Sequence, residues 1–306
     1  MNTRIALIGL CVLLAQGVVV GEGPTGALPG SAAPVPAAVL LRWRVPPEAP
    51  LVFRTAMAPV RPGAKGFLKI DAAELLEGAA LDPKLAQEMT QEMVFPSQSS
   101  MFTVLRALPD ENISVKMIVE QISADGGAMA DAMKAMEGTV QLRGRITPAG
   151  RIASWWLEQK QKNLLALFTE LPTKTVRVGD TWSLQTSLVE VGHGFVCDES
   201  DYSNQVRLAA LEKAGDDKVA VIDYSLAESV VGKFVMPIGP QAGRAQPFSM
   251  SMIFVGRGEF LVGKGSWRKF AGRMEIKGSG MMQADVQQQF LLVPSDEIPA
   301  ALLSLE

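Results

Sequence analysis

The side chains best suited to chemistry in this sequence lie close together, around its single histidine. His193 is followed four residues later by Cys197, with Asp198 beside it. A cysteine and a histidine can form a nucleophile with its base, or part of a metal site. A zinc site needs three or four ligands, and the only other cysteine of the 306 residues is Cys11. We therefore predict no catalytic residue, no metal and no other cofactor here, and interpret His193 as a solvated loop residue beside a buried thiol.

Paired carboxylates are the one catalytic arrangement that the composition leaves open. The chain holds 32 Asp and Glu residues, and two that are distant in sequence can meet in a cleft, as they do in glycosidases. No spacing singles out such a pair, and Glu259 on a predicted strand is better explained by a solvent-facing position. A hydrolase that uses paired carboxylates is therefore the alternative function.

Five of the 15 methionines have two interpretations, of which packing in the core is preferred and an apolar binding groove is the alternative. They lie on segments that we expect to be helical, at spacings of three and four residues. Soft, unbranched side chains can line an adaptable apolar groove, although they also pack well in ordinary cores. The candidate ligand-binding residues are Met89, Met93, Met129, Met133 and Met136.

The overall charge excludes one class of partner. The formal net charge is −3 at pH 7, with 29 Lys and Arg against 32 Asp and Glu. A protein that neutralises a phosphate backbone needs a basic surface, so we expect no nucleic-acid partner. The expected partner is an apolar ligand or a protein of the cell envelope.

The N-terminus predicts export. Arg4 precedes an uncharged apolar stretch from Ile5 to Val20, which is typical of a signal peptide within residues 1–21. Sixteen residues are short for a membrane span, which needs about 20, so no integral span is expected after cleavage. Residues 22–37 are rich in Pro, Ala and Gly and predict a linker. We expect a periplasmic or extracellular protein, tethered at the membrane if the signal is not cleaved.

From residue 38 to 306 the dominant pattern is alternation of apolar and polar residues, which is typical of half-buried strands. Turn residues at 148–150, 215–217 and 263–265 separate such runs. The predicted fold is mainly β with inserted helices (α+β), built on a long curved antiparallel sheet that is either open or closed like a barrel. Helices are expected near residues 71–80, 82–93, 127–136 and 158–170, and two halves could meet near residue 172.

The most distinctive segment is residues 168–182, FTELPTKTVRVGDTW. We interpret Leu171, Pro172, Gly179, Asp180 and Trp182 as a structural motif in which Gly179 takes a positive φ, Asp180 bonds downstream amides and Trp182 anchors the sheet. Together with GRITPAG at residues 144–150, this motif resembles an uncharacterised family of exported bacterial envelope proteins with a domain of unknown function. The resemblance implies export and a β-rich fold, and it implies no activity.

These observations together favour a non-enzymatic, soluble module of the cell envelope. Its expected role is to bind an apolar ligand or a partner protein.

Overall fold

The structure is a computed structural model, and it describes residues 38–61, 66–70, 91–94, 98–123, 131, 134–156, 160–189, 191, 194–235 and 243–296. These residues are mainly β. The elements are β1 (Leu51–Pro59), β2 (Phe67–Ile70), β3 (Gln91–Val94), β4 (Gln98–Ala107), β5 (Ile113–Ser123), β6 (Val140–Ile146), β7 (Ile152–Trp156), α4 (Lys160–Thr169), β8 (Thr181–Trp182), β9 (Phe195–Ala214), β10 (Asp217–Val235), β11 (Ala245–Leu261), β12 (Ser266–Gly280) and β13 (Met282–Pro294).

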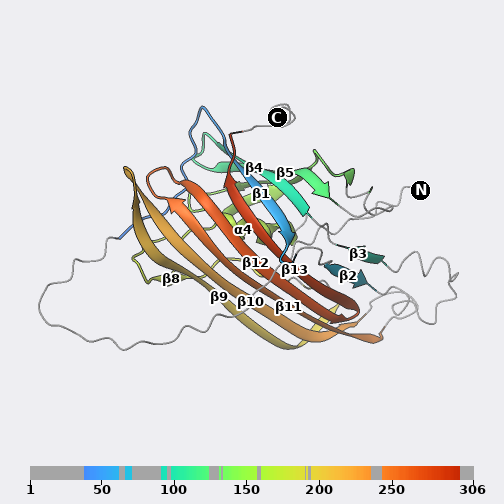
Figure 1. Cartoon of the computed structure of the whole chain (residues 1–306). Helices are drawn as coiled ribbons and strands as arrows, with labels where there is room; N and C mark the ends of the chain where they lie inside the picture. Colours follow the sequence, from blue (N-terminus) through green and yellow to red (C-terminus); the bar gives the residue numbers. More distant parts are fainter. Residues whose placement is uncertain are drawn as a thin grey trace, which may run out of the picture.

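The strands form one antiparallel sheet in the order β7-β6-β5-β4-β1-β13-β12-β11-β10-β9-β8, with β2 and β3 attached beside β13. The long strands β9 to β13 cross the whole molecule in Figure 1 and bend along their length. Pairing of β1 with β13 places the first strand of the chain beside the last one. Within the described ranges β7 and β8 end the sheet without pairing with each other, so the sheet is open and not a closed barrel.

Alternation explains where these strands form. In β5, Ile113, Val115 and Met117 are buried while Ser114 and Lys116 are more exposed. The predicted turns at 148–150, 215–217 and 263–265 join β6 to β7, β9 to β10 and β11 to β12. The antiparallel, β-rich prediction is therefore confirmed.

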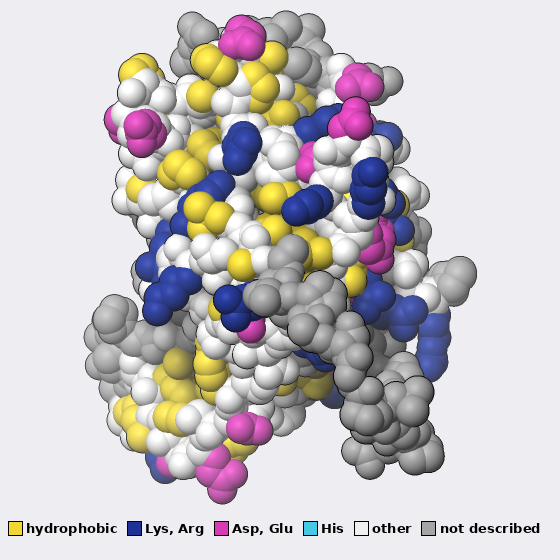
Figure 2. Space-filling view, turned by 90° about the vertical axis from the view of Figure 1, so that its left-hand side faces the viewer, with side chains coloured by type: hydrophobic (Ala, Val, Ile, Leu, Met, Phe, Trp, Pro, Cys, Tyr) yellow, Lys and Arg dark blue, Asp and Glu magenta, His cyan; other side chains and the backbone are white. Residues whose placement is uncertain are grey.

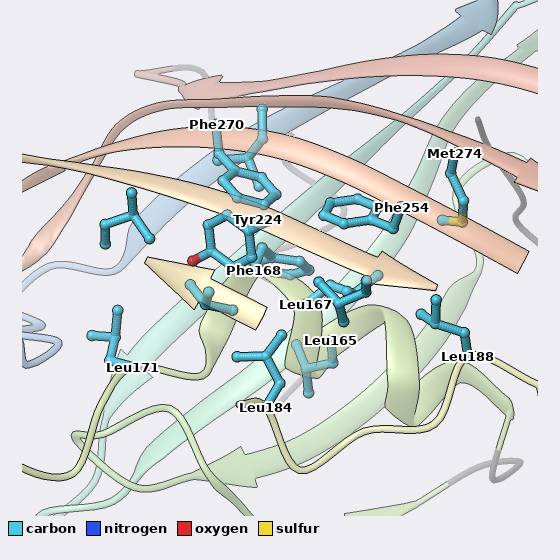
Figure 3. Close-up of a cluster of buried hydrophobic side chains, with 14 of the residues drawn as sticks. Leu165, Leu167, Phe168, Leu171, Leu184, Leu188, Tyr224, Phe254, Phe270 and Met274 are labelled. Atoms are coloured by element: carbon cyan, nitrogen blue, oxygen red, sulfur yellow. The ribbon is translucent and has the colours of Figure 1, made fainter. Parts of the chain in front are cut away.

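One face of the sheet packs on α4 and on the chain that follows it. Figure 3 shows Leu165, Leu167 and Phe168 of α4 beside Tyr224 of β10 and Phe254 of β11. These side chains belong to the main hydrophobic core. The face of β10–β13 and β1 that lies opposite this core is called the outer face below.

Two tryptophans hold the C-terminal end of α4 against the sheet. The Trp43 indole donates to the Thr169 carbonyl oxygen at 2.7 Å, and the Trp267 indole donates to the Phe168 carbonyl oxygen at 2.6 Å. The last carbonyls of a helix lack partners within the helix, and these bonds satisfy two of them.

The two distinctive sequence segments pack on each other. The Leu171 amide donates to the Ala149 carbonyl oxygen at 2.8 Å, and the Thr169 hydroxyl donates to the Gly150 carbonyl oxygen at 3.1 Å. Gly150 has φ 74°, and a Cβ added there would lie 1.6 Å from the Thr169 carbonyl oxygen. The turn at 148–150 therefore requires glycine for both its conformation and its contact with the end of α4.

The inserted helices are only partly seen. α4 lies within the predicted 158–170 segment, and residues 131 and 134–138 contain a helical turn in which the Ala135 amide donates to the Asp131 carbonyl oxygen. Residues 71–90 and 124–130 lie outside the described residues. The prediction that Met93 lies on a helix is wrong, because Met93 is on strand β3 opposite Leu68. Pairing with β2 outweighs a short run of apolar residues at helical spacing, which is ambiguous by itself.

Tyr224 offers a direct test of core packing. Its side chain is fully buried and its hydroxyl has no hydrogen-bond partner among the described residues. Burial, with a smaller contribution from the charge of Glu170, raises the pKa of the Tyr224 phenol. Because an unpaired buried hydroxyl costs about 1–3 kcal/mol, Tyr224→Phe is expected to raise the free energy of unfolding by about 1 kcal/mol in urea titrations. A loss of stability would show that the hydroxyl is hydrogen-bonded in solution.

Candidate functional site

Most of the methionines that the sequence suggested as a binding site lie beyond the part of the chain whose side chains the structure describes. Met89, Met129 and Met133 lie outside the described residues, and only the backbone of Met93 is described. Met136 is half-buried in a turn, where its carbonyl oxygen accepts from the Thr139 amide at 3.0 Å and the Thr139 hydroxyl at 2.6 Å. A methionine-lined groove therefore stays a prediction.

Of the histidine and the cysteine that the sequence singled out, the structure describes only the cysteine. His193 lies outside the described residues, and Cys197 is exposed, with its Sγ 3.3 Å from the Glu199 carbonyl oxygen. The expectation of a buried thiol is wrong because this end of β9 is exposed on both faces. Within the described ranges, no group of three His, Cys, Asp or Glu side chains could hold a metal ion.

A groove of about 1010 Å³ crosses the outer face over β10, β11, β12, β13 and β1. It is called the outer groove, and its outward side chains include Ala56, Val255, Arg257, Lys269, Ala271, Arg273 and Leu291. Sheet register explains this composition, because Ala271 stands between Arg257 and Leu291, and Leu291 stands opposite Ala56. Small side chains therefore form the floor of the groove, with larger ones beside them.

The outer groove is both cationic and apolar. Arg257 is held by Asp223, with Nε–Oδ1 and Nη2–Oδ2 distances of 2.6 and 3.1 Å. Lys269 and Arg273 are exposed and make no hydrogen bond or ion pair with any residue that the structure describes. Val255 and Leu291 are 42% and 41% exposed, which is high for large apolar side chains. The groove thus presents two unpaired cations beside apolar surface.

A second pocket, of about 550 Å³, brings the sequence motif together. It is called the motif pocket and is lined by Arg151 and residues 170–176 and 179–183. Leu171, Pro172, Gly179, Asp180 and Trp182 all lie on it, from the end of α4 to β8. The five motif residues that the sequence singled out therefore surround one hollow.

The turn within the motif attaches the pocket wall to the sheet. Gly179 has φ 96°, and the Asp180 amide donates to the Arg177 carbonyl oxygen at 3.0 Å. This is a β-turn whose third residue has a positive φ, which favours glycine. The Asp180 carboxylate accepts from the Arg177 amide at 2.8 Å, so it bonds an upstream amide and not a downstream one as expected. The Gly179 amide then donates to the Leu208 carbonyl oxygen of β9 at 2.8 Å.

Glu170 is the residue of this pocket that sequence reasoning missed. It is 4% exposed, and its Oε2 accepts from the Gln185 amide at 2.8 Å. Its Oε1 lies 3.8 Å from Arg151 Nε, which is too long for a hydrogen bond. Burial raises the pKa of the Glu170 carboxyl, against the opposing effects of the Gln185 amide and Arg151. The only sequence signal for a buried carboxyl is the position of Glu170 between the apolar end of α4 and Leu171.

The raised pKa of Glu170 predicts a pH dependence of stability. The folded state binds this proton more tightly than the unfolded state. The contribution of the Glu170 carboxyl to the free energy of unfolding therefore falls as pH rises from the ordinary glutamate pKa of about 4.3 through the raised pKa. Wild type should therefore lose stability relative to Glu170→Gln as pH rises above about 4.3, as measured by urea unfolding. The exposed control Glu212→Gln should show no such trend, and a difference that is constant with pH would contradict the prediction.

Two carboxylates line the motif pocket, Glu170 and Asp180. Asp180 is occupied by the turn, since it accepts from the Arg177 amide. In the outer groove the single carboxylate, Asp223, is paired with Arg257. Glu259 forms an ion pair with Arg268 at 2.8 Å. The paired-carboxylate hydrolase therefore stays a hypothesis without a specific observation in its favour.

Figure 2 shows the side of the molecule on which β8 lies in Figure 1. Lys and Arg side chains are spread across the middle of that side, with hydrophobic side chains between them, and Asp and Glu lie mostly toward its upper and lower parts.

None of the described helices is long and apolar enough to cross a membrane.

Comparison with known proteins gives no relative from which a function could be transferred. The sequence matches no protein-family model and no curated protein, and the structure matches no solved structure.

Proposed function

We propose that the protein is a non-enzymatic module of the cell envelope that binds an apolar ligand with an anionic head group in the outer groove. The observation that carries this proposal is a pair of cations, Lys269 and Arg273, that have no partner among the described residues and line the groove with the exposed side chains of Val255 and Leu291. A long-chain carboxylate combines the two properties that this surface complements.

Charge supports an anionic head group. Arg257 is neutralised by Asp223, so Lys269 and Arg273 leave an excess of positive charge in the groove. A hydrogen bond to a charged group contributes about 1.5–3 kcal/mol, so two such contacts would decide between an anionic and a cationic amphiphile.

The floor of the groove supports an extended apolar body. Ala56 and Ala271 keep the floor low, and the groove spans five neighbouring strands. Strands lie about 4.8 Å apart, so the groove is about 19 Å across, which suits an extended long-chain fatty acid. Burying Val255 and Leu291 would add a favourable hydrophobic contribution.

The test is calorimetric titration of the full chain with three amphiphiles of equal chain length below their micelle concentrations: myristate, tetradecanol and tetradecyltrimethylammonium. Myristate is expected to bind most tightly. Lys269→Gln with Arg273→Gln should weaken myristate binding by about tenfold or more, since 1.4 kcal/mol corresponds to a factor of ten.

The matched control is Lys213→Gln with Lys218→Gln, which removes two positive charges near the β9–β10 turn and away from the groove. This control should leave myristate binding unchanged. Absence of myristate binding, or equal losses in both double variants, would contradict the proposal. A partner protein on the same face would then be the remaining occupant, and crosslinking from position 271 in intact cells would reveal it.

The envelope location rests on the N-terminal sequence and has its own test. Mass spectrometry of protein recovered from cells that produce it naturally should show a chain that lacks the segment up to about residue 21. Recovery of the uncleaved chain from the cytoplasm would contradict the location.

A further inference from the structure

We propose that the motif pocket is a second binding site, for a neutral saccharide, in which a sugar hydroxyl bridges Arg151 and Glu170 and the sugar ring lies on Trp182. This site is separate from the outer groove and does not depend on the function proposed for it.

Arg151 Nε and Glu170 Oε1 are close enough together for one hydroxyl oxygen to lie within hydrogen-bond distance of both. Arg151 Nε and Glu170 Oε1 are 3.8 Å apart, and Arg151 Nε is buried with no hydrogen-bond partner among the described residues. The Glu170 side chain is 5% exposed and still lines the pocket. A hydroxyl is the group that accepts one hydrogen bond and donates another, so it can satisfy the donor and the carboxylate at once. Neither a carboxylate nor an ammonium group could do both.

Trp182 supplies the second element of the site. Its ring is half-buried on β8 and lines the pocket, and its Nε1 is buried without a hydrogen-bond partner in the described part of the chain. An indole combines an apolar surface with one donor, which suits a ligand that has both C–H faces and hydroxyl oxygens. Saccharides have this combination, whereas a purely apolar ligand would leave the indole N–H unpaired.

The rest of the lining favours a polar and uncharged ligand. Thr173, Thr175 and Thr181 add hydroxyl groups at the rim. The positive charges of Arg151 and Lys174 equal the negative charges of Glu170 and Asp180 when both carboxyls are ionised. A buried unpaired donor or acceptor costs about 1–3 kcal/mol, so a ligand that satisfies these groups gains specificity. The volume of about 550 Å³ is within the range of small-molecule sites.

The experiment follows the indole N–H resonance of Trp182 in the full chain, identified by its loss in Trp182→Phe. The probes are the neutral methyl pyranosides of the common hexoses and N-acetylhexosamines with their β1,4-linked trimers, and inorganic phosphate. At least one saccharide is expected to shift this resonance with a millimolar or lower Kd. Glu170→Gln and Arg151→Lys should each weaken that binding by about tenfold, as expected for a lost hydrogen bond to a charged group.

Two controls separate this result from folding and from the outer groove. Glu212→Gln, an exposed carboxylate on β9, should leave saccharide binding unchanged, and so should Lys269→Gln with Arg273→Gln. If no saccharide of the panel shifts the Trp182 resonance, or if Glu170→Gln binds as well as wild type, the inference is wrong. A shift caused by phosphate alone would also overturn it, because it would identify an anion site. A lack of myristate binding would contradict only the function proposed for the outer groove, because the saccharide test concerns the motif pocket.

Discussion

Gly150→Ala is expected to lower the free energy of unfolding by about 3 kcal/mol or more. This is a large effect for the addition of a single methyl group. Gly150 has φ 74°, and a Cβ added there would lie 1.6 Å from the Thr169 carbonyl oxygen and 2.3 Å from the Thr169 carbonyl carbon. Both contacts are with backbone, so no side-chain rotation can relieve them. The turn at 148–150 would have to move away from the end of α4, which would break the bond from the Leu171 amide to Ala149. Urea unfolding of the full chain measures the loss.

Gly179→Ala is the matched control for this experiment. Gly179 also has a positive φ, 96°, but nothing lies within 4 Å of an added Cβ. Only the conformational cost of a left-handed residue remains, about 1–2 kcal/mol. Equal losses at Gly150 and Gly179 would show that the contact with Thr169 does not stabilise the fold.

Trp267→Ala is expected to cost about 3–5 kcal/mol, also measured by urea unfolding. The Trp267 side chain is fully buried, and its ring lies edge-on to Phe260 at a centroid distance of 5.0 Å. Its indole donates to the Phe168 carbonyl oxygen at 2.6 Å. The substitution would therefore leave a cavity beside Phe260 and an unpaired carbonyl at the end of α4.

Two further variants separate the parts of this effect. Trp267→Phe keeps most of the ring and removes the indole donor, so it should cost about 1–3 kcal/mol. Trp182→Ala removes a half-buried tryptophan whose Nε1 has no partner among the described residues, and it should cost less than Trp267→Ala. A cost at Trp182 as large as that at Trp267 would contradict the assignment of Trp267 to the centre of the core.

Local patterns in the sequence predicted much of the sheet. Alternation in β5 and β10 and the turns at 215–217 and 263–265 concern neighbouring residues, and such patterns determine strands and hairpins directly. The pairing of β1 with β13 joins residues more than 200 positions apart, and no local pattern specifies it. The strand at Met93 and the exposure of Cys197 were missed for the same reason, since each depends on which strand lies beside it.

The candidate sites differ in how far the sequence could anticipate them. The motif residues Gly179 and Trp182 were recognisable from their types and spacing. Glu170 becomes a candidate site residue only because the fold places Arg151 and Gln185 beside it. The outer groove depends on cross-strand register, because Val255, Ala271 and Leu291 come from three strands and become neighbours only when those strands pair. Register across several strands is a property of the whole sheet, so the sequence alone could not place these residues together.

The most direct test of ligand binding in the outer groove uses stearate that carries a nitroxide spin label on its chain. The label broadens the amide resonances of residues near it in the isotopically labelled full chain. The proposed function predicts broadening at Val255, Ala271 and Leu291, which is lost when unlabelled stearate competes, and little change at Trp182. Broadening that centres away from β11, β12 and β13, or no broadening at saturating stearate, would contradict the account.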